Sequence, residues 1–130
     1  MNLKIMTPAK VIFEGEVEEV SLPGVNGEFG VLRDHAEMIS SLSTGICRYT
    51  RKGGESDRIM VSLGACHISN NEIKVLTQFA EYKNEIDPSK AKESLAEIEQ
   101  KLISAGLAED ERTYLESARA REQTRLELLS

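Results

Sequence analysis

The amino-acid composition changes abruptly near residue 84, and this change limits the folds open to the chain. Eight of the nine glycines and most of the β-branched residues precede that point. The remainder is rich in Ala, Leu, Glu, Lys and Arg and holds a single glycine, Gly106. The first composition is typical of strands joined by turns, and the second is typical of helices. We therefore expect an α+β chain in two parts, an all-β domain over residues 1–84 and a helical domain over residues 85–130.

Apolar and polar residues alternate in short runs within the first part, as they do in half-buried strands. In the run 46–51 the side chains of Cys47 and Tyr49 are expected on the face opposite Arg48. A later run alternates in the same way and predicts one inward face, formed by Ile59, Val61, Leu63 and Ala65.

Two short segments between these runs carry turn residues. The segment 52–55 reads Lys-Gly-Gly-Glu and the segment 69–72 reads Ser-Asn-Asn-Glu, and both contain residues that tolerate positive φ. Many short strands with closely spaced turns indicate a β-sandwich or a flattened barrel.

The second part predicts two helices. Asp87 is a strong N-cap and Pro88 suits the first helical position. One apolar stripe follows at helical spacing, and it consists of Ala91, Leu95, Ile98 and Leu102. Gly106 is expected as the C′ residue, and three acidic residues at 109–111 open a second helix. The short link predicts an antiparallel two-helix hairpin. Its apolar stripe is narrow and rich in Ala, so we expect the hairpin to pack weakly and to be easily displaced.

The charge balance excludes several classes of function. The chain carries 16 Lys and Arg against 22 Asp and Glu, for a net charge of −6, and it has no basic run. Because nucleic-acid binding needs clustered cations, we expect no DNA or RNA partner. The apolar runs are too short to span a membrane, so we expect membrane association only through a partner. Residues 1–10 lack a signal-peptide core, so we also expect both cysteines to stay reduced.

Few side chains suggest catalysis or metal binding. A zinc site would need the scattered residues Cys47, Cys66, His67 and His35 to converge, so buried structural thiols are favoured and no metal is expected. The glycine-rich segment 22–32 lacks the GK[ST] ending of a phosphate loop and is better read as a turn between strands. Arg33-Asp34-His35 has no nucleophile at a suitable spacing, and a local hydrogen bond explains it better. We therefore expect a protein that is not an enzyme.

Arg121 and Arg125 lie one turn apart on the same face of the second predicted helix. Such pairs are usually solvated or paired with neighbouring Glu residues, although two arginines also suit an anion. From residues alone, the chain is a β-domain with a mobile helical hairpin that acts through interactions.

The segment LPGVNGEFGVLRDHA, residues 22–36, resembles the signature of the epsilon subunit of bacterial and chloroplast F-type ATP synthases, called delta in mitochondria. The resemblance extends over the whole chain, through the opening strand at 3–7, Gly64 and the two-helix tail. One departure is Glu37, where the family usually has Pro. The resemblance implies a ten-stranded sandwich followed by the hairpin. Without a transit peptide, we expect a bacterial protein.

The family resemblance implies a non-catalytic subunit of the central rotor. Its partners would be the gamma subunit, the c-ring and the beta and alpha subunits, and it would lie peripherally on the cytoplasmic side of the bacterial inner membrane. The sandwich would couple rotation of the ring to gamma, and hence to ATP synthesis. The hairpin would be regulatory, because in the family it lies folded on the sandwich or extends toward the catalytic head and blocks hydrolysis.

The resemblance also implies three sets of contact residues. The c-ring would be faced by Glu28, Arg33, Asp34 and His35. The catalytic head would meet Arg119, Arg121 and Arg125 of the extended hairpin. No cofactor is required, but some members bind regulatory ATP through an I/L-D-x-x-R-A motif and two arginines. The matching residues here are Ile86, Asp87, Lys90, Ala91, Arg121 and Arg125, and Lys90 replaces the arginine that grips an anion in two places.

Three hypotheses remain open at this stage. The first is a rotor subunit with a regulatory hairpin. The second is the same subunit with a permanently folded, purely structural hairpin. The third is an unrelated small enzyme or ligand-binding β-domain that shares the glycine-rich segment by chance.

Overall fold

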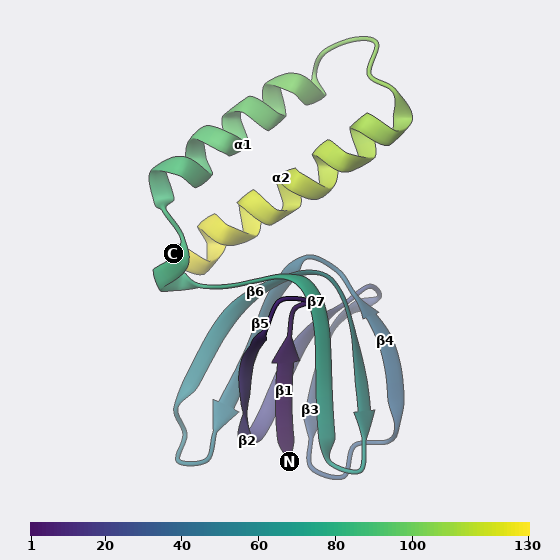
Figure 1. Ribbon diagram of the computed structural model, residues 1–130, viewed down its shortest axis with the longest axis vertical. Helices are drawn as coiled ribbons and strands as arrows, with labels where there is room; N and C mark the ends of the chain where they lie inside the picture. Colours follow the sequence, from purple (N-terminus) through teal and green to yellow (C-terminus); the bar gives the residue numbers. More distant parts are fainter.

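The computed structural model describes residues 1–130 and places an all-β part before an all-helical part, as expected (Figure 1). The strands are β1 (Asn2–Met6), β2 (Val11–Gly24), β3 (Gly27–Leu32), β4 (Met38–Leu42), β5 (Gly45–Arg51), β6 (Ser56–Ser69) and β7 (Glu72–Tyr82). A 3-10 turn, η1 (Lys83–Glu85), leads into the helices α1 (Pro88–Leu102) and α2 (Glu109–Leu129).

The strands form a closed, flattened structure. β1 pairs antiparallel with β2 and parallel with β7, and β5 lies between β2 and β6. Because β6 also pairs with β7, hydrogen bonding runs from β1 through β2, β5, β6 and β7 back to β1. β3 adds to β2, and β4 adds to β6. The predicted sandwich or flattened barrel is confirmed.

The strand count differs from the expected ten, since the sheet contains seven strands. The reason lies in β2 and β6, each of which has 14 residues. In Figure 1, β6 and β7 bend over the end of the sandwich nearest the helices and continue in the opposite layer. One long bent strand therefore spans both layers and takes the place of two short strands.

The core lies between the layers and holds a single cluster of 16 buried residues. Leu3 and Ile5 are fully buried, and in β5 the side chains of Cys47 and Tyr49 face inward while Arg48 is exposed. The alternation in β5 agrees with the sequence prediction.

The two predicted turns are present and depend on positive φ. Gly53 and Gly54 have φ of 106° and 94°, and Asn70 and Asn71 have φ of 52° and 61°. Gly64 is needed for a different reason. A Cβ there would lie 2.7 Å from the carbonyl oxygen of Leu76 on the neighbouring strand, which is too close for any other residue.

One predicted face in β6 is wrong. Ile59 and Val61 point inward as expected, but Leu63 and Ala65 are exposed, and Cys66 and Ile68 are buried in their place. Leu63 has φ of 59°, a left-handed conformation that a leucine rarely adopts, and it lies where the strand bends. The bend therefore exchanges the inward and outward faces of β6.

The helical hairpin follows the predicted local signals, with one exception. The Asp87 carboxylate accepts hydrogen bonds from the backbone N–H groups of Ser89 and Lys90, and Pro88 occupies the first turn. Gly106 is not the C′ residue, because α1 ends at Leu102 and Gly106 lies in the link with φ of 84°. Arg112 of α2 donates a hydrogen bond to the Leu102 carbonyl. The free carbonyl at the end of α1 is therefore satisfied by a side chain, and not by the backbone of a C′ glycine.

The hairpin lies on one end of the sandwich, with α2 nearer to it than α1 (Figure 1). The C-terminal half of α2 approaches the strands, and α1 packs on α2. Neither helix is long and apolar enough to cross a membrane.

Candidate functional site at the junction of sandwich and hairpin

α2 docks on the sandwich where β6 and β7 bend. Met60 is fully buried yet lies outside the core cluster, because it points away from the sandwich interior. On β7, Ala80 and Tyr82 pack against the core, so Phe79 and Glu81 project from the opposite face toward α2. Phe79 and Glu81 therefore present an apolar and an acidic side chain to the docked helix.

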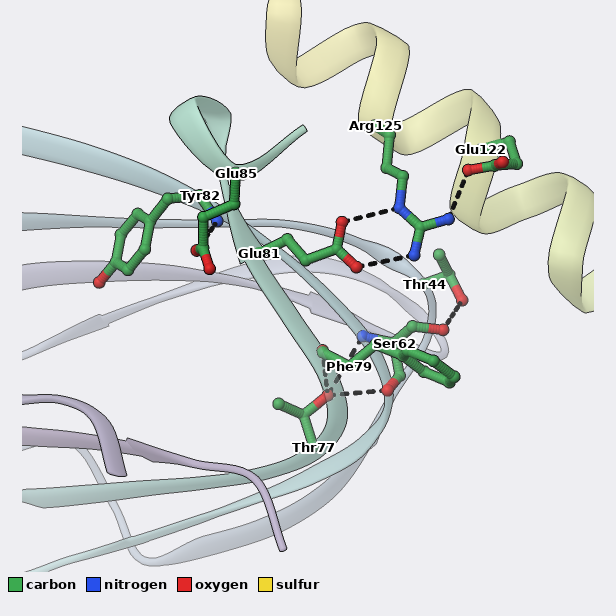
Figure 2. Close-up of polar contacts among 9 residues, drawn as sticks. All are labelled: Thr44, Ser62, Thr77, Phe79, Glu81, Tyr82, Glu85, Glu122 and Arg125. Atoms are coloured by element: carbon green, nitrogen blue, oxygen red, sulfur yellow. Dashed lines mark hydrogen bonds and ion pairs between the residues drawn. The ribbon is translucent and has the colours of Figure 1, made fainter. Parts of the chain in front are cut away.

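Arg125 joins the two parts of the chain (Figure 2). Its Nε and Nη2 atoms donate to the two carboxylate oxygens of Glu81 on β7, at 2.8 and 2.7 Å. Its Nη1 atom donates to Glu122 on α2 itself. The side chains of Arg125, Glu81 and Glu122 are 19%, 26% and 8% exposed, so water screens the cluster only partly. We call these three residues the ionic clasp.

The electrostatics of the ionic clasp favour the charged arginine. Hydrogen bonding to Glu81 raises the pKa of Arg125, burial lowers it, and the bonds to Glu122 raise it further, with a net upward shift. Arg125 is therefore cationic at every pH at which the protein folds, and its charge is balanced by two carboxylates.

Arg121 is 8% exposed and also engaged. Its Nη1 atom donates to Ser117 at 3.0 Å, and its guanidinium carbon lies 4.3 Å from the centre of the Phe79 ring. This cation–π contact adds a second link between α2 and β7. Arg119 is half-buried and has no hydrogen bond or ion pair from its side chain. The predicted shared face of Arg121 and Arg125 is confirmed. The expectation of a neighbouring Glu partner holds for Arg125, which binds Glu122, and not for Arg121.

Two of the residues expected to bind ATP line one cavity, and the other four do not. Arg121 and Arg125 line a cavity of about 410 Å³ between the helices and Phe79. Ile86, Asp87, Lys90 and Ala91 do not line it. The Asp87 carboxylate caps α1, and Ala91 is buried. The ATP site that the resemblance implies stays a prediction.

The residues expected to face the c-ring lie at two separate places. Glu28 follows the β2–β3 turn and accepts a hydrogen bond from Ser21 at 2.8 Å. Arg33, Asp34 and His35 follow the other end of β3.

The Arg33–His35 segment makes one local and one long-range set of hydrogen bonds. Asp34 has φ of 66°, and its backbone N–H donates to the side chain of Asn71 at 2.7 Å. His35 bonds to the neighbouring Ala36 carbonyl through Nδ1, as the local interpretation predicted.

The four residues considered for zinc do not converge. Cys47 and Cys66 are buried free thiols, whereas His67 is exposed on β6. No group of three or more His, Cys, Asp or Glu side chains is arranged to hold a metal ion. Burial raises the pKa of Cys47 to about 12 and also raises that of Cys66, so both thiols stay protonated and unreactive.

Sequence reasoning missed Met60, Phe79, Glu81 and Glu122. The i, i+3 spacing of Glu122 and Arg125 carried a signal for that pair. Glu81 lies 44 residues from Arg125, and no local pattern connects them.

Comparison with known proteins identifies the class. The family model described as "ATP synthase, Delta/Epsilon chain, beta-sandwich domain" matches residues 1–83. The ATP synthase epsilon chain of Gloeobacter violaceus is 40% identical over 105 residues, covering 81% of this chain and 79% of the relative. That of a Synechocystis species is 31% identical over 128 residues, covering 98% and 93%.

A solved structure resembles the chain along nearly its full length. It is a chain of the Euglena gracilis mitochondrial ATP synthase structure described as "OSCP/F1/c-ring in rotational state 1", with a TM-score of 0.84, 28% identity and coverage of 96% of this chain and 78% of that one. The fold and these matches define a small, non-catalytic subunit of a larger assembly. The chain belongs to the delta/epsilon family of ATP synthase subunits.

Proposed function

We propose that the chain is a rotor subunit of the central stalk of an F-type ATP synthase, where the sandwich joins gamma to the c-ring and passes rotation between them. The observation that carries this proposal is the likeness to the Euglena chain across both parts, the hairpin included. A closed sheet around one core supplies the stiffness that transmission of torque requires. Partners and place follow: gamma, the ring, the alpha and beta subunits, and the cytoplasmic side of a bacterial inner membrane.

Contact with the ring is proposed through Glu28 or through the segment from Arg33 to His35. Since these lie at opposite ends of β3, single cysteines at Glu28 and at Asp34 test them separately by crosslinking to the ring. A crosslink from one position alone would assign that end, and a crosslink from neither would exclude both.

The finer proposal is that the hairpin regulates ATP hydrolysis by leaving the sandwich. Its support is that the docked state already uses two of the three arginines expected to meet the catalytic head. Arg121 is stacked on Phe79 and Arg125 is bound to Glu81. These arginines reach an acidic partner only after α2 separates, so docking and inhibition are mutually exclusive. A few polar contacts at one helix end are the kind of interface that a two-state switch requires.

The decisive experiment measures ATP hydrolysis by the catalytic head lacking this subunit, before and after the chain is added. We expect the rate to fall with the full chain and to recover when residues 88–130 are deleted. Binding to gamma with an unchanged rate would support the alternative, a purely structural rotor subunit. Failure of the chain to bind gamma would contradict the rotor assignment itself and support an unrelated β-domain.

Regulatory ATP fits the docked arrangement poorly. The charge of Arg125 is balanced by two carboxylates, and Lys90 lacks the forked donor geometry of arginine. A nucleotide would have to displace Glu81 before Arg125 could hold a phosphate. We expect no ATP-dependent protection of α2 in hydrogen exchange of the free chain, and such protection would overturn this assessment.

A further inference from the structure

A second cavity lies at the junction of the two parts, and neither the ionic clasp nor the arginine-lined cavity includes its residues. Its volume is about 650 Å³, within the range of small-molecule sites. Its walls come from three places: Arg58 at the start of β6, Tyr82 and Lys83 at the end of β7 and in η1, and Leu128 and Leu129 at the end of α2.

The polar side of this cavity is cationic. Asp57 also lines it, and its carboxylate accepts a hydrogen bond from Arg51 at 2.6 Å, while the same guanidinium lies 3.5 Å from Glu55. Arg58 donates once, through Nη2 to the Leu128 carbonyl at 3.3 Å, and has no carboxylate partner. The Lys83 ammonium makes no ion pair or hydrogen bond. Two exposed cations without an ion-pair partner therefore line the cavity beside a single carboxylate, that of Asp57, in a chain of net charge −6.

The other side of the cavity is apolar, formed by the Tyr82 ring and the two leucines. A purely inorganic anion would leave these groups facing water. We propose that this cavity binds a small organic anion that joins one carboxylate, sulfonate or phosphate group to an apolar ring or chain. Arg58 and Lys83 hold the anionic group, and Tyr82, Leu128 and Leu129 cover the apolar body.

Binding at this place is coupled to the position of the hairpin. The cationic wall belongs to the sandwich and to η1, whereas the leucines belong to α2. The complete cavity exists only while α2 is docked, so the ligand stabilises the docked arrangement by mass action. This inference concerns the free chain and does not depend on whether the hairpin inhibits hydrolysis.

The test uses the full chain and the fluorescent anion 8-anilinonaphthalene-1-sulfonate as the probe. We expect one-to-one binding that shifts the methyl resonances of Leu128 and Leu129 and slows hydrogen exchange at the end of α2. The uncharged analogue N-phenyl-1-naphthylamine is expected to bind at least about tenfold more weakly, because it lacks the anionic group.

Two variants and one control locate the site. Lys83→Gln and Arg58→Gln should each weaken probe binding about three- to tenfold, and Lys83→Gln removes no contact within the protein, so its effect reports on the ligand. Arg48→Gln, an exposed cation on β5, should leave binding unchanged. Equal affinity for the two dyes, wild-type affinity of Lys83→Gln, or shifts confined to other methyl groups would each overturn the proposal.

Discussion

The sandwich and the hairpin are held by different forces. In the sandwich, 16 buried residues form one cluster and the strands close on themselves, so its stability comes from apolar burial and a continuous hydrogen-bonded ladder. At the interface between α2 and the sandwich, two charged residues, Arg121 and Glu122, are buried, as is Leu128. Such contacts fix a position well but add little net stability, because the charges lose hydration when they are buried. The difference suits a rigid sandwich with a hairpin that can separate from it.

The largest effect is expected from the sandwich core. Leu22→Ala removes a fully buried side chain, and the cavity it leaves should lower the free energy of unfolding by about 2–5 kcal/mol. Urea unfolding followed by circular dichroism measures the change. Ile39→Ala, at an exposed position on β4, is the matched control and should change the free energy of unfolding by no more than about 0.5 kcal/mol. Equal effects of the two substitutions would contradict the assigned core.

A smaller loss of stability is expected at the bend of the sandwich. Gly64→Ala forces a Cβ against the Leu76 carbonyl and should lower the free energy of unfolding by about 1–3 kcal/mol. Gly30→Ala is the control, since a Cβ there meets nothing within 4 Å. Thermal unfolding of both variants tests whether close approach, and not glycine itself, is the requirement.

The ionic clasp should affect the hairpin while leaving the sandwich intact. Arg125→Met keeps most of the aliphatic stem but removes the charge, and we expect docking of α2 to weaken by about 1–3 kcal/mol. Hydrogen exchange should then accelerate in the C-terminal half of α2 and remain unchanged in β2. Arg119→Met, on the same helix but without an ion pair, should leave exchange near wild type. Equal acceleration of hydrogen exchange by Arg125→Met and Arg119→Met would contradict this role of Arg125, because the effect would then come from a general loss of helix stability.

The smallest predicted effect is alkaline sensitivity of the sandwich. Because burial raises the pKa of Cys47 to about 12, the folded protein keeps a proton that the unfolded chain releases near pH 9. Its contribution to stability is complete below that pH and is lost as pH rises toward 12. We expect the free energy of unfolding to fall by about 1 kcal/mol between pH 8.5 and 10, with a smaller fall in Cys47→Ala. An identical pH profile for the variant would exclude this thiol.

What could be predicted from sequence depended on how far apart the interacting residues lie. The Asp87–Pro88 helix start and the turn at Asn70 are local, and both were predicted correctly. The exchange of faces at Leu63 was missed, because a left-handed leucine is strained and only the bend of the whole strand holds it there. The ion pair of Arg125 joins it to Glu81, 44 residues away, so the surface on which α2 docks could not be predicted either.

The family motif predicted less about sites than about class. It identified the family, whereas the ATP site that it implies stays a prediction, since only Arg121 and Arg125 of the six residues line the cavity between the helices. The alternating pattern likewise predicted the layered sheet but overstated the number of strands, since it gave no sign that β6 continues through the bend.

The most direct test of a rigid sandwich with a detachable hairpin is a distance measurement between them. Spin labels on cysteines introduced at Lys52, in the β5–β6 turn, and at Ser104, in the link between the helices, report the hairpin position, while the buried native thiols stay unlabelled. In the docked chain the two labels lie at opposite ends of the molecule (Figure 1). We predict one distance in the free chain and a second, different distance when the chain is bound to the catalytic head, with the second enriched by Arg125→Met. A single unchanged distance in every sample would contradict the account and leave the hairpin as a fixed part of the rotor.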